Sequence, residues 1–250
     1  MLRIILSGCC GKMGKVLNDI VKNDESCKIV AGVDPVDTAY DDFPIFDKFD
    51  NLPNADVIVD FSNPSALDGM LTYAAKNKLP CVIATTGYSE QEIKKIQTAS
   101  TLIPIFFTSN LSLGINLLVS LSKKAAEILG GDFDVEIIEK HHNQKIDAPS
   151  GTAIMLANAI NETMDNKMIY EYDRHAKRAK RSKNEIGMHS VRGGTIVGEH
   201  EIIFAGNDEV VSLKHQAFSK SVFVAGALKA AKFIHNKPAA MYDMNDLILL

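Results

Sequence analysis

The sequence has no apolar run of about 20 residues, the length that a membrane-spanning helix needs. The first apolar stretch, residues 2–6, gives way to a glycine-rich turn at Gly8, so we expect no secretory signal peptide. Only four cysteines occur, all in the first third of the chain and none at the spacing of a zinc site. We therefore expect reduced thiols, a cytoplasmic location and no membrane association.

A strong net charge is also absent. The 250 residues carry a formal net charge of −4 and give a pI near 6.0. This balance provides no general attraction to nucleic acid or to an anionic membrane, so we expect no nucleic-acid partner. Internal repeats and low-complexity segments are absent too. The length suggests one large or two modest domains.

Strand-like and helix-like patterns alternate over residues 1–110. Short apolar runs typical of buried parallel strands occur at residues 2–7, 28–33, 56–61, 80–85 and 104–108. Helical patterns separate most of these runs. The alternation predicts an α/β fold with a Rossmann-like, doubly wound parallel sheet that carries helices on both faces.

A glycine-rich turn, Gly8-Cys9-Cys10-Gly11-Lys12-Met13-Gly14, joins the first strand to the helix after it. Glycines in such a turn let the backbone approach a pyrophosphate, and the start of the helix faces its charge. The spacing Gly-x-x-Gly-x-x-Gly is a variant of the usual fingerprint, and a tight turn in another α/β fold is the alternative. We predict a dinucleotide site here.

Asp34 ends the second strand, 20 residues beyond Gly14. A carboxylate at this position can accept hydrogen bonds from the adenosine ribose and repels the additional phosphate of NADPH. Pro35 adds no positive charge to offset it, although Lys12 could. We expect NADH to be used at least as well as NADPH.

Polar residues follow two further strands. Thr85-Thr86-Gly87 and Asn110 come after the runs at 80–85 and 104–108. Taken singly, such residues are usually turn residues. Because ligands of open parallel sheets bind at the carboxyl ends of the strands, their common edge favours a binding role.

The polar stretch 139–153 reads Glu-Lys-His-His-Asn-Gln-Lys-Ile-Asp-Ala-Pro-Ser-Gly-Thr-Ala. Small and apolar residues at helical spacing follow it, so it is a loop that enters a helix. Asp147, Ser150 or Thr152 could cap that helix. The amide groups at a helix N-terminus favour an anion.

Three basic residues of this stretch add to the anion site. Lys145 carries a positive charge, and His141 and His142 can add more charge or donate protons. The stretch therefore predicts a site that holds a carboxylate next to a proton donor. A metal site built from both histidines, Glu139 and Asp147 is the weaker alternative, because adjacent histidines project differently. We expect no metal.

A strand-rich block follows residue 112. Strands are expected at 133–140, 186–192, 195–205 and 209–217, which could form one mixed sheet. Helices are expected at 114–129, 152–163 and 219–234, and a tail from Pro238. We predict a smaller α+β domain of residues 113–219 and a discontinuous first domain of residues 1–112 and 220–250. The active site would be the cleft between them.

Residues 173–183 are rich in basic side chains but lack interleaved aromatic residues. Single-stranded nucleic acid is usually held by aromatic stacking as well as charge. We therefore interpret this segment as a solvated connector, of which a few charges could face an anionic ligand.

The motifs together resemble the 4-hydroxy-tetrahydrodipicolinate reductase family, also called dihydrodipicolinate reductases. The matching pieces follow the family order and cover nearly the whole chain. They are residues 8–14, 59–62, 84–87, 110–116, 139–153, 192–200 and 242–244. The loop His-His-x-x-Lys-x-Asp-Ala-Pro-Ser-Gly-Thr is the most specific of them.

The resemblance implies reduction of 4-hydroxy-tetrahydrodipicolinate, a dicarboxylate, to tetrahydrodipicolinate in lysine and diaminopimelate biosynthesis, with NADH or NADPH. It implies that His141 and Lys145 are the proton donors, while His142, Gly151 and Thr152 bind substrate. It also implies a homotetramer assembled through the sheet of the second domain. The implied cofactor contacts are Gly8, Cys9, Cys10, Gly11, Lys12, Met13, Asp34, Ala84, Thr85, Thr86, Ser109, Asn110 and Leu111.

Two positions depart from the family pattern. Ala84 stands where the family often has glycine, which is a small change. Pro35 stands where the family often has a basic residue, which puts a preference for NADPH in doubt. Two other functions stay open from the residues alone: a different two-domain oxidoreductase acting on an amino or hydroxy acid, and a non-catalytic dinucleotide-binding regulator.

Overall fold

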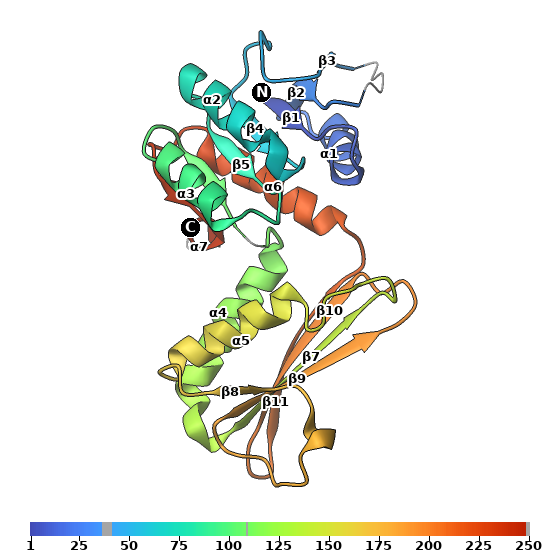
Figure 1. Ribbon diagram of the computed structural model, residues 1–250, viewed down its shortest axis with the longest axis vertical. Coiled ribbons are helices and arrows are strands. Elements are labelled where there is room, and N and C mark those ends of the chain that lie inside the picture. The colour runs from blue at the N-terminus through green and yellow to red at the C-terminus, as the bar shows by residue number, and fades with distance from the viewer. Residues whose placement is uncertain (37–41, 109, 249–250) are drawn as a thin grey trace. The chain divides into compact units, whose positions relative to one another are not determined.

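The computed structural model describes residues 1–36, 42–108 and 110–248 (Figure 1). The chain divides into two compact units, Met1–Leu113 with Ser221–Leu250, and Gly114–Lys220. The domain boundaries expected from sequence were 112/113 and 219/220. No helix in the described part of the chain is long and apolar enough to cross a membrane.

Unit 1 is built on a seven-stranded sheet of order β12-β6-β5-β4-β1-β2-β3. All of its neighbouring strands run parallel. The order 3-2-1-4-5-6 is that of the doubly wound dinucleotide-binding fold, so the predicted fold class is confirmed. The strands are β1 (Leu2–Ser7), β2 (Cys27–Val33), β3 (Ile45–Phe46), β4 (Val57–Asp60), β5 (Cys81–Ile83), β6 (Ile105–Phe107) and β12 (Met241–Tyr242).

Helices cover both faces of this sheet (Figure 1). On one face Leu17 and Ala227 pack in the core cluster that contains Leu6. On the other face Met70 and Ile96 pack with Ile5. The helices are α1 (Lys12–Lys22), α2 (Leu67–Asn77) after a 3-10 turn at Pro64–Ala66, α3 (Glu90–Ala99), α6 (Ser221–Ile234) and α7 (Met244–Ile248).

The C-terminal segment differs from expectation. Residues after Pro238 were expected to form a tail, but Met241 and Tyr242 pair with β6 as the edge strand β12. The Tyr242 ring also packs edge-on against Phe233 of α6, with 5.7 Å between centroids. A two-residue strand has too little pattern to be found from sequence, because the neighbouring strand and helix determine its place.

Unit 2 holds a mixed five-stranded sheet of order β11-β10-β7-β9-β8, as the sequence predicted in part. Two helices, α4 (Leu113–Leu129) and α5 (Gly151–Thr163), pack on one face of it. The short strand β8 was not predicted. The strands are β7 (Asp134–His141), β8 (Ile169–Glu171), β9 (Glu185–Arg192), β10 (Gly198–Ala205) and β11 (Val210–Ala217).

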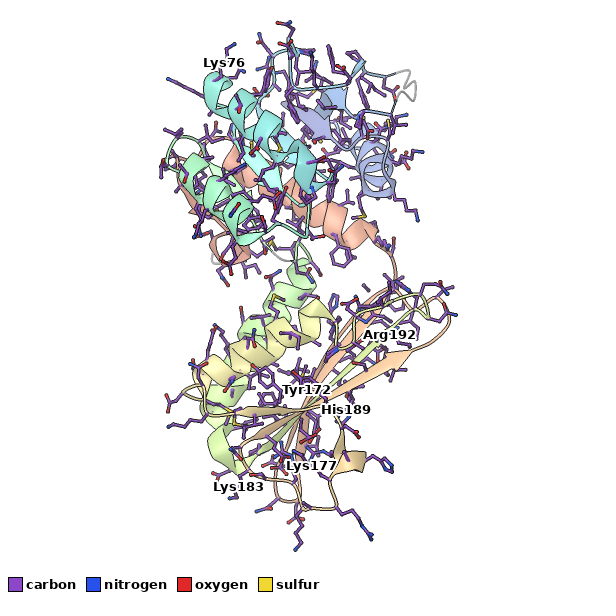
Figure 2. The ribbon with its side chains drawn as sticks, viewed as in Figure 1. Lys76, Tyr172, Lys177, Lys183, His189 and Arg192 are labelled. Atoms are coloured by element: carbon purple, nitrogen blue, oxygen red, sulfur yellow. The ribbon has the colours of Figure 1, made fainter. Side chains whose placement is uncertain are left out.

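The interpretation of residues 173–183 as a solvated connector was wrong for Arg174 and Arg181. Arg174 and Arg181 both pair with Glu136 of β7, at 2.8 and 3.1 Å. Arg181 also pairs with Asp134, and Lys177, labelled in Figure 2, pairs with Glu171. The segment is thus tied by ion pairs to the central strand β7 and to β8, which only the folded sheet brings into register.

Candidate active site

The glycine turn at the end of β1 requires its glycines. Gly8 has a φ of +74°, and a Cβ there would lie 2.5 Å from the carbonyl oxygen of Phe61. A Cβ at Gly14 would lie 2.3 Å from the carbonyl oxygen of Gly8. Helix α1 begins right after Gly11, and no side chain caps it. The closely packed turn and uncapped helix start therefore fit a bound pyrophosphate.

Asp34 ties this turn to the end of β2. Its carboxylate accepts hydrogen bonds from the backbone amides of Cys10 and Val36, both at 3.0 Å. The side chain is 9% exposed. It borders a cavity of about 510 Å³ whose lining also includes Gly8, Gly11 and Lys48. The cavity thus joins the glycine turn to the carboxylate that the sequence singled out.

The other turn residues lie outside the lining of that cavity. Cys9 is fully buried, and burial raises the pKa of its thiol to about 12. Cys10 and Met13 are half-buried, and Lys12 is exposed. All four cysteines are thiols. These residues shape the turn, and Gly8 and Gly11 are the residues of the turn that line the cavity, together with Asp34.

The remaining cofactor candidates follow β5 and β6. Because these strands are parallel to β1, their carboxyl ends share its edge of the sheet. Ala84 is half-buried, Thr85 is buried and Thr86 is exposed. Asn110 is half-buried and Leu111 belongs to the core. Ser109 lies outside the described residues.

In unit 2 the candidate site is centred on Glu139, near the end of β7. This carboxylate is 1% exposed. Arg192, at the end of β9, donates to both of its oxygens, at 2.7 and 2.8 Å (Figure 2). The amide of Ser150 donates at 3.1 Å, and His141 Nδ1 lies 2.6 Å away. Burial alone would raise the pKa of Glu139, but the hydrogen bonds from Arg192 and His141 lower it to about 2.

His141 is the last residue of β7 and its side chain is 12% exposed. Its ring packs edge-on against that of His200, with 5.2 Å between centroids. Burial lowers the pKa of His141, with Lys145 and Arg192 acting in the same direction and Glu139 opposing them. The side chain is therefore a buried imidazole whose proton affinity depends on neighbouring charges.

His200 lies deeper than His141. It is 4% exposed, and its Nε2 lies 3.0 Å from the hydroxyl oxygen of Ser150. Burial, with the nearby charge of His141, lowers the pKa of His200 to about 4. His200 is therefore neutral at physiological pH and supports the site without adding charge.

The loop after His141 presents Lys145 and the start of α5. Lys145 Nζ lies 2.7 Å from Asp147 Oδ1. Ser150, one of the three cap candidates, is the N-cap of α5, and its hydroxyl accepts from the amide of Ala153. Gly151 and Thr152 form the first turn of that helix. Lys145 and the start of an α-helix thus belong to one short segment, as the sequence predicted.

Sequence reasoning missed the roles of Glu139, Arg192 and His200. A signal was available for Glu139, since strand alternation places it on the same face as the buried Val135 and Ile137. Arg192 and His200 begin and end one of the stretches that resemble the family, but the local sequence gave them no role, because strand pairing brings them to Glu139 across the sheet. His142 is half-buried in the same loop.

Both carboxylates of the alternative metal site are engaged in ion pairs. Glu139 binds Arg192 and His141, and Asp147 binds Lys145. Within the described part of the chain, metal-type donor atoms come together only at Cys9, Cys10 and Asp34, all within 4.8 Å of one another. That cluster forms part of the glycine turn.

Family comparison covers both units. The family model described as dihydrodipicolinate reductase, N-terminus, matches residues 2–111, and that for the C-terminus matches residues 114–248. A 4-hydroxy-tetrahydrodipicolinate reductase of Caldanaerobacter subterraneus is 52% identical over 99% of this chain and 98% of that protein. One of Clostridium novyi is 47% identical with the same coverage.

Solved structures agree with this relationship. A dipicolinate-bound dihydrodipicolinate reductase from Paenisporosarcina sp. TG-14 has a TM-score of 0.81 at 25% identity, covering 98% of this chain and 99% of that one. A myo-inositol 2-dehydrogenase from Lactobacillus plantarum shares only the fold, with a TM-score of 0.60 at 13% identity, over 99% of this chain and 93% of that one. The chain belongs to the dihydrodipicolinate reductase family, a family of oxidoreductases.

Proposed function

We propose that this protein reduces 4-hydroxy-tetrahydrodipicolinate to tetrahydrodipicolinate in lysine and diaminopimelate biosynthesis, using NADH or NADPH. The observation that carries the proposal is the loop 141–152, in which His141, Lys145 and the start of α5 follow one another. Full-length relatives that carry the name of this activity support it. A dicarboxylate substrate and a proton requirement both fit this loop.

His141 and Lys145 supply the proton in this proposal. Reduction of an electron-poor ring leaves negative charge that a proton or a nearby cation must meet. His141 has one nitrogen held by Glu139, and its second nitrogen is the one available to substrate. Lys145 adds an ammonium group in the same loop. Either group can deliver the proton while the other stabilises the charge.

The start of α5 and its neighbours bind the substrate carboxylates. Gly151 and Thr152 present backbone amides in the first turn of a 13-residue helix. A helix start is favourable for an anion, and Lys145 and His142 add side-chain donors. The dipicolinate named with the structure from Paenisporosarcina is a dicarboxylate of the same class, which supports this assignment.

The glycine turn of unit 1 binds the dinucleotide. The fit rests on Gly8 and Gly14, where a Cβ would meet backbone, and on the uncapped start of α1. When bound, the dinucleotide supplies the hydride. Asp34 is placed to accept hydrogen bonds from the ribose and to repel a 2′-phosphate, so NADH is used at least as well as NADPH. The other contacts are the family's: Cys9, Cys10, Gly11, Lys12, Met13, Ala84, Thr85, Thr86, Ser109, Asn110 and Leu111.

The protein is proposed to act as a cytoplasmic homotetramer assembled through the sheet of unit 2. Helices α4 and α5 cover one face of that sheet. The opposite face carries Ile138 and Ile203 outside the core cluster, and Val191 is 44% exposed. Burying these side chains against a second copy is favourable at about 25 cal/mol per Å² of apolar surface. The four thiols fit a reducing compartment.

The activity is tested in a coupled assay. Pyruvate and aspartate semialdehyde are condensed enzymatically, and oxidation of NADH or NADPH is followed by absorbance. Rapid oxidation that depends on the condensing enzyme supports the proposal. Protein that binds NADH but gives no oxidation would contradict it and favour another oxidoreductase.

Sedimentation of wild type and Ile203→Glu tests the tetramer, which the substitution should dissociate.

A further inference from the structure

Glu139 accepts hydrogen bonds from Arg192, Ser150 and His141 and is nearly inaccessible to solvent. One oxygen accepts from Arg192 Nη2 and from the amide of Ser150, at 2.7 and 3.1 Å. The other accepts from Arg192 Nη1 at 2.8 Å and lies 2.6 Å from His141 Nδ1. An ionised carboxylate can only accept, so the His141 hydrogen must sit on Nδ1.

From this geometry we infer that Glu139 is a positioning residue, which fixes His141 in the Nδ1–H form so that Nε2 is the nitrogen that exchanges a proton with substrate. The inference rests on the proposed role of His141. It names Glu139 as the residue that determines which ring nitrogen of His141 exchanges the proton. A carboxylate that orients a histidine and stabilises its charged form is a recurring arrangement in proton transfer.

The other ring nitrogen of His141, Nε2, is not crowded by a side chain from the neighbouring strand β10. A Cβ at Gly198 would lie 3.2 Å from His141 Nε2 and 3.6 Å from its Cδ2. Any side chain at position 198 of β10 would therefore contact His141 Nε2. The glycine keeps the Nε2 side of the ring uncrowded, whereas the Nδ1 side is closed by Glu139.

Arg192 restricts how the side chain at position 139 can be oriented. It binds both oxygens of Glu139, and its Nη2 also donates to the carbonyl oxygen of Asp147 at 2.6 Å. In Glu139→Gln, the orientation that keeps the carbonyl oxygen with Arg192 Nη2 and Ser150 turns the NH2 group toward His141 and toward Arg192 Nη1, whose hydrogen bond is lost. Nδ1 would then have to accept, and the hydrogen would move to Nε2.

The charges around His141 determine in which direction its pKa changes when Glu139 is replaced. Among the described residues, Glu139 is the anion that contacts His141, while Lys145 from the loop and Arg192 from β9 oppose its protonation and His200 from β10 is neutral. Removing the carboxylate leaves only opposing charges. The pKa of His141 should therefore fall further in Glu139→Gln.

The first test is ¹⁵N NMR of histidine-labelled protein without substrate. The signals of His141 are assigned by their absence from the spectrum of His141→Asn. The neutral Nδ1–H form is expected in wild type and the Nε2–H form in Glu139→Gln. A neutral Nε2–H form in wild type overturns the inference, whether or not the protein reduces the proposed substrate. This measurement therefore separates the inference from the proposed function.

The second test is the pH profile of kcat/KM. In Glu139→Gln we expect a loss of about 10- to 100-fold at pH 7 that shrinks as the pH is lowered, with partial recovery in Glu139→Asp. Glu136→Gln is the matched control, since Glu136 lies on the same strand, pairs with arginines and faces away from His141. A pH-independent loss in Glu139→Gln would indicate a merely structural role and overturn the inference.

Discussion

Lys145 and Asp147 form an ion pair within one loop, with 2.7 Å between Nζ and Oδ1. The Asp147 side chain is 58% exposed, so water screens the pair. Exposed pairs of this kind contribute about 0–1 kcal/mol. The pair therefore orients Lys145 without holding it tightly, and a substrate carboxylate can replace Asp147 as its partner.

Removing either proposed proton donor should slow the reaction without loss of cofactor binding. We expect Lys145→Ala and His141→Ala to lower kcat/KM by about 10²- to 10⁴-fold, the usual loss for an acid catalyst. NADH affinity, measured by fluorescence titration, should be retained because the dinucleotide residues lie in unit 1.

The control for Lys145 is Lys167→Ala. Lys167 pairs with Asp165 at 2.9 Å, with the same two-residue separation, and both side chains are more than 70% exposed. This variant should keep wild-type turnover. Wild-type turnover by both Lys145→Ala and His141→Ala would contradict the assignment of the loop.

Asp34→Asn should shift the cofactor preference toward NADPH. The substitution removes the charge that repels a 2′-phosphate and keeps most of the shape of the side chain. We expect the ratio of kcat/KM for NADPH to that for NADH to rise about tenfold, equivalent to about 1.4 kcal/mol. Asp19→Asn, on the exposed side of α1, removes the same charge and should leave the ratio unchanged. A ratio that falls in Asp34→Asn would show that the carboxylate does not oppose NADPH.

Gly8→Ala should weaken dinucleotide binding and destabilise unit 1. The φ of +74° costs an alanine about 1–2 kcal/mol, before the contact at 2.5 Å with Phe61 is counted. Thermal unfolding and NADH titration measure the two effects. Gly131→Ala, where an added Cβ meets nothing within 4 Å, should behave as wild type. Unchanged NADH affinity in Gly8→Ala would argue against the turn as the pyrophosphate site.

His200 should make the folded state sensitive to mild acid. Its pKa is about 4 in the folded state against 6.5 ordinarily. Between these pH values the unfolded chain binds more protons than the folded protein. The contribution of His200 to the free energy of unfolding is therefore complete above about pH 6.5 and is lost as the pH falls toward 4. The loss is of the order of 3 kcal/mol, since each tenfold change in proton affinity is worth about 1.4 kcal/mol.

Urea unfolding at pH 7, 5.5 and 4.5 measures this dependence. His200→Gln should flatten it over that window, whereas His175→Gln, an exposed histidine, should not. The same slope in wild type and in His200→Gln would show that other groups are responsible.

Much of the fold was available from local pattern. Apolar runs, the glycine turn and the helical stripes predicted the doubly wound sheet because a buried parallel strand has a composition of its own. The capping box at Ser89, whose Ser-x-x-Glu spacing can be read in the sequence, is present with both of its hydrogen bonds. The loop 139–153 was singled out because its basic residues, cap and helix are neighbours in the chain.

The tertiary structure alone decided what surrounds that loop. Arg192 and His200 reach the site through the pairing of β7 with β9 and β10, a relationship between residues about 50 to 60 positions apart. The burial of Glu139 depends on which face of the sheet α5 covers. The ion pairs of residues 173–183 depend on the strands that the segment meets, above all the central strand β7. Sequence by itself determined the chemical groups and their order. Long-range packing determined their burial, partners and proton affinities, because those depend on atoms that only the folded chain brings together.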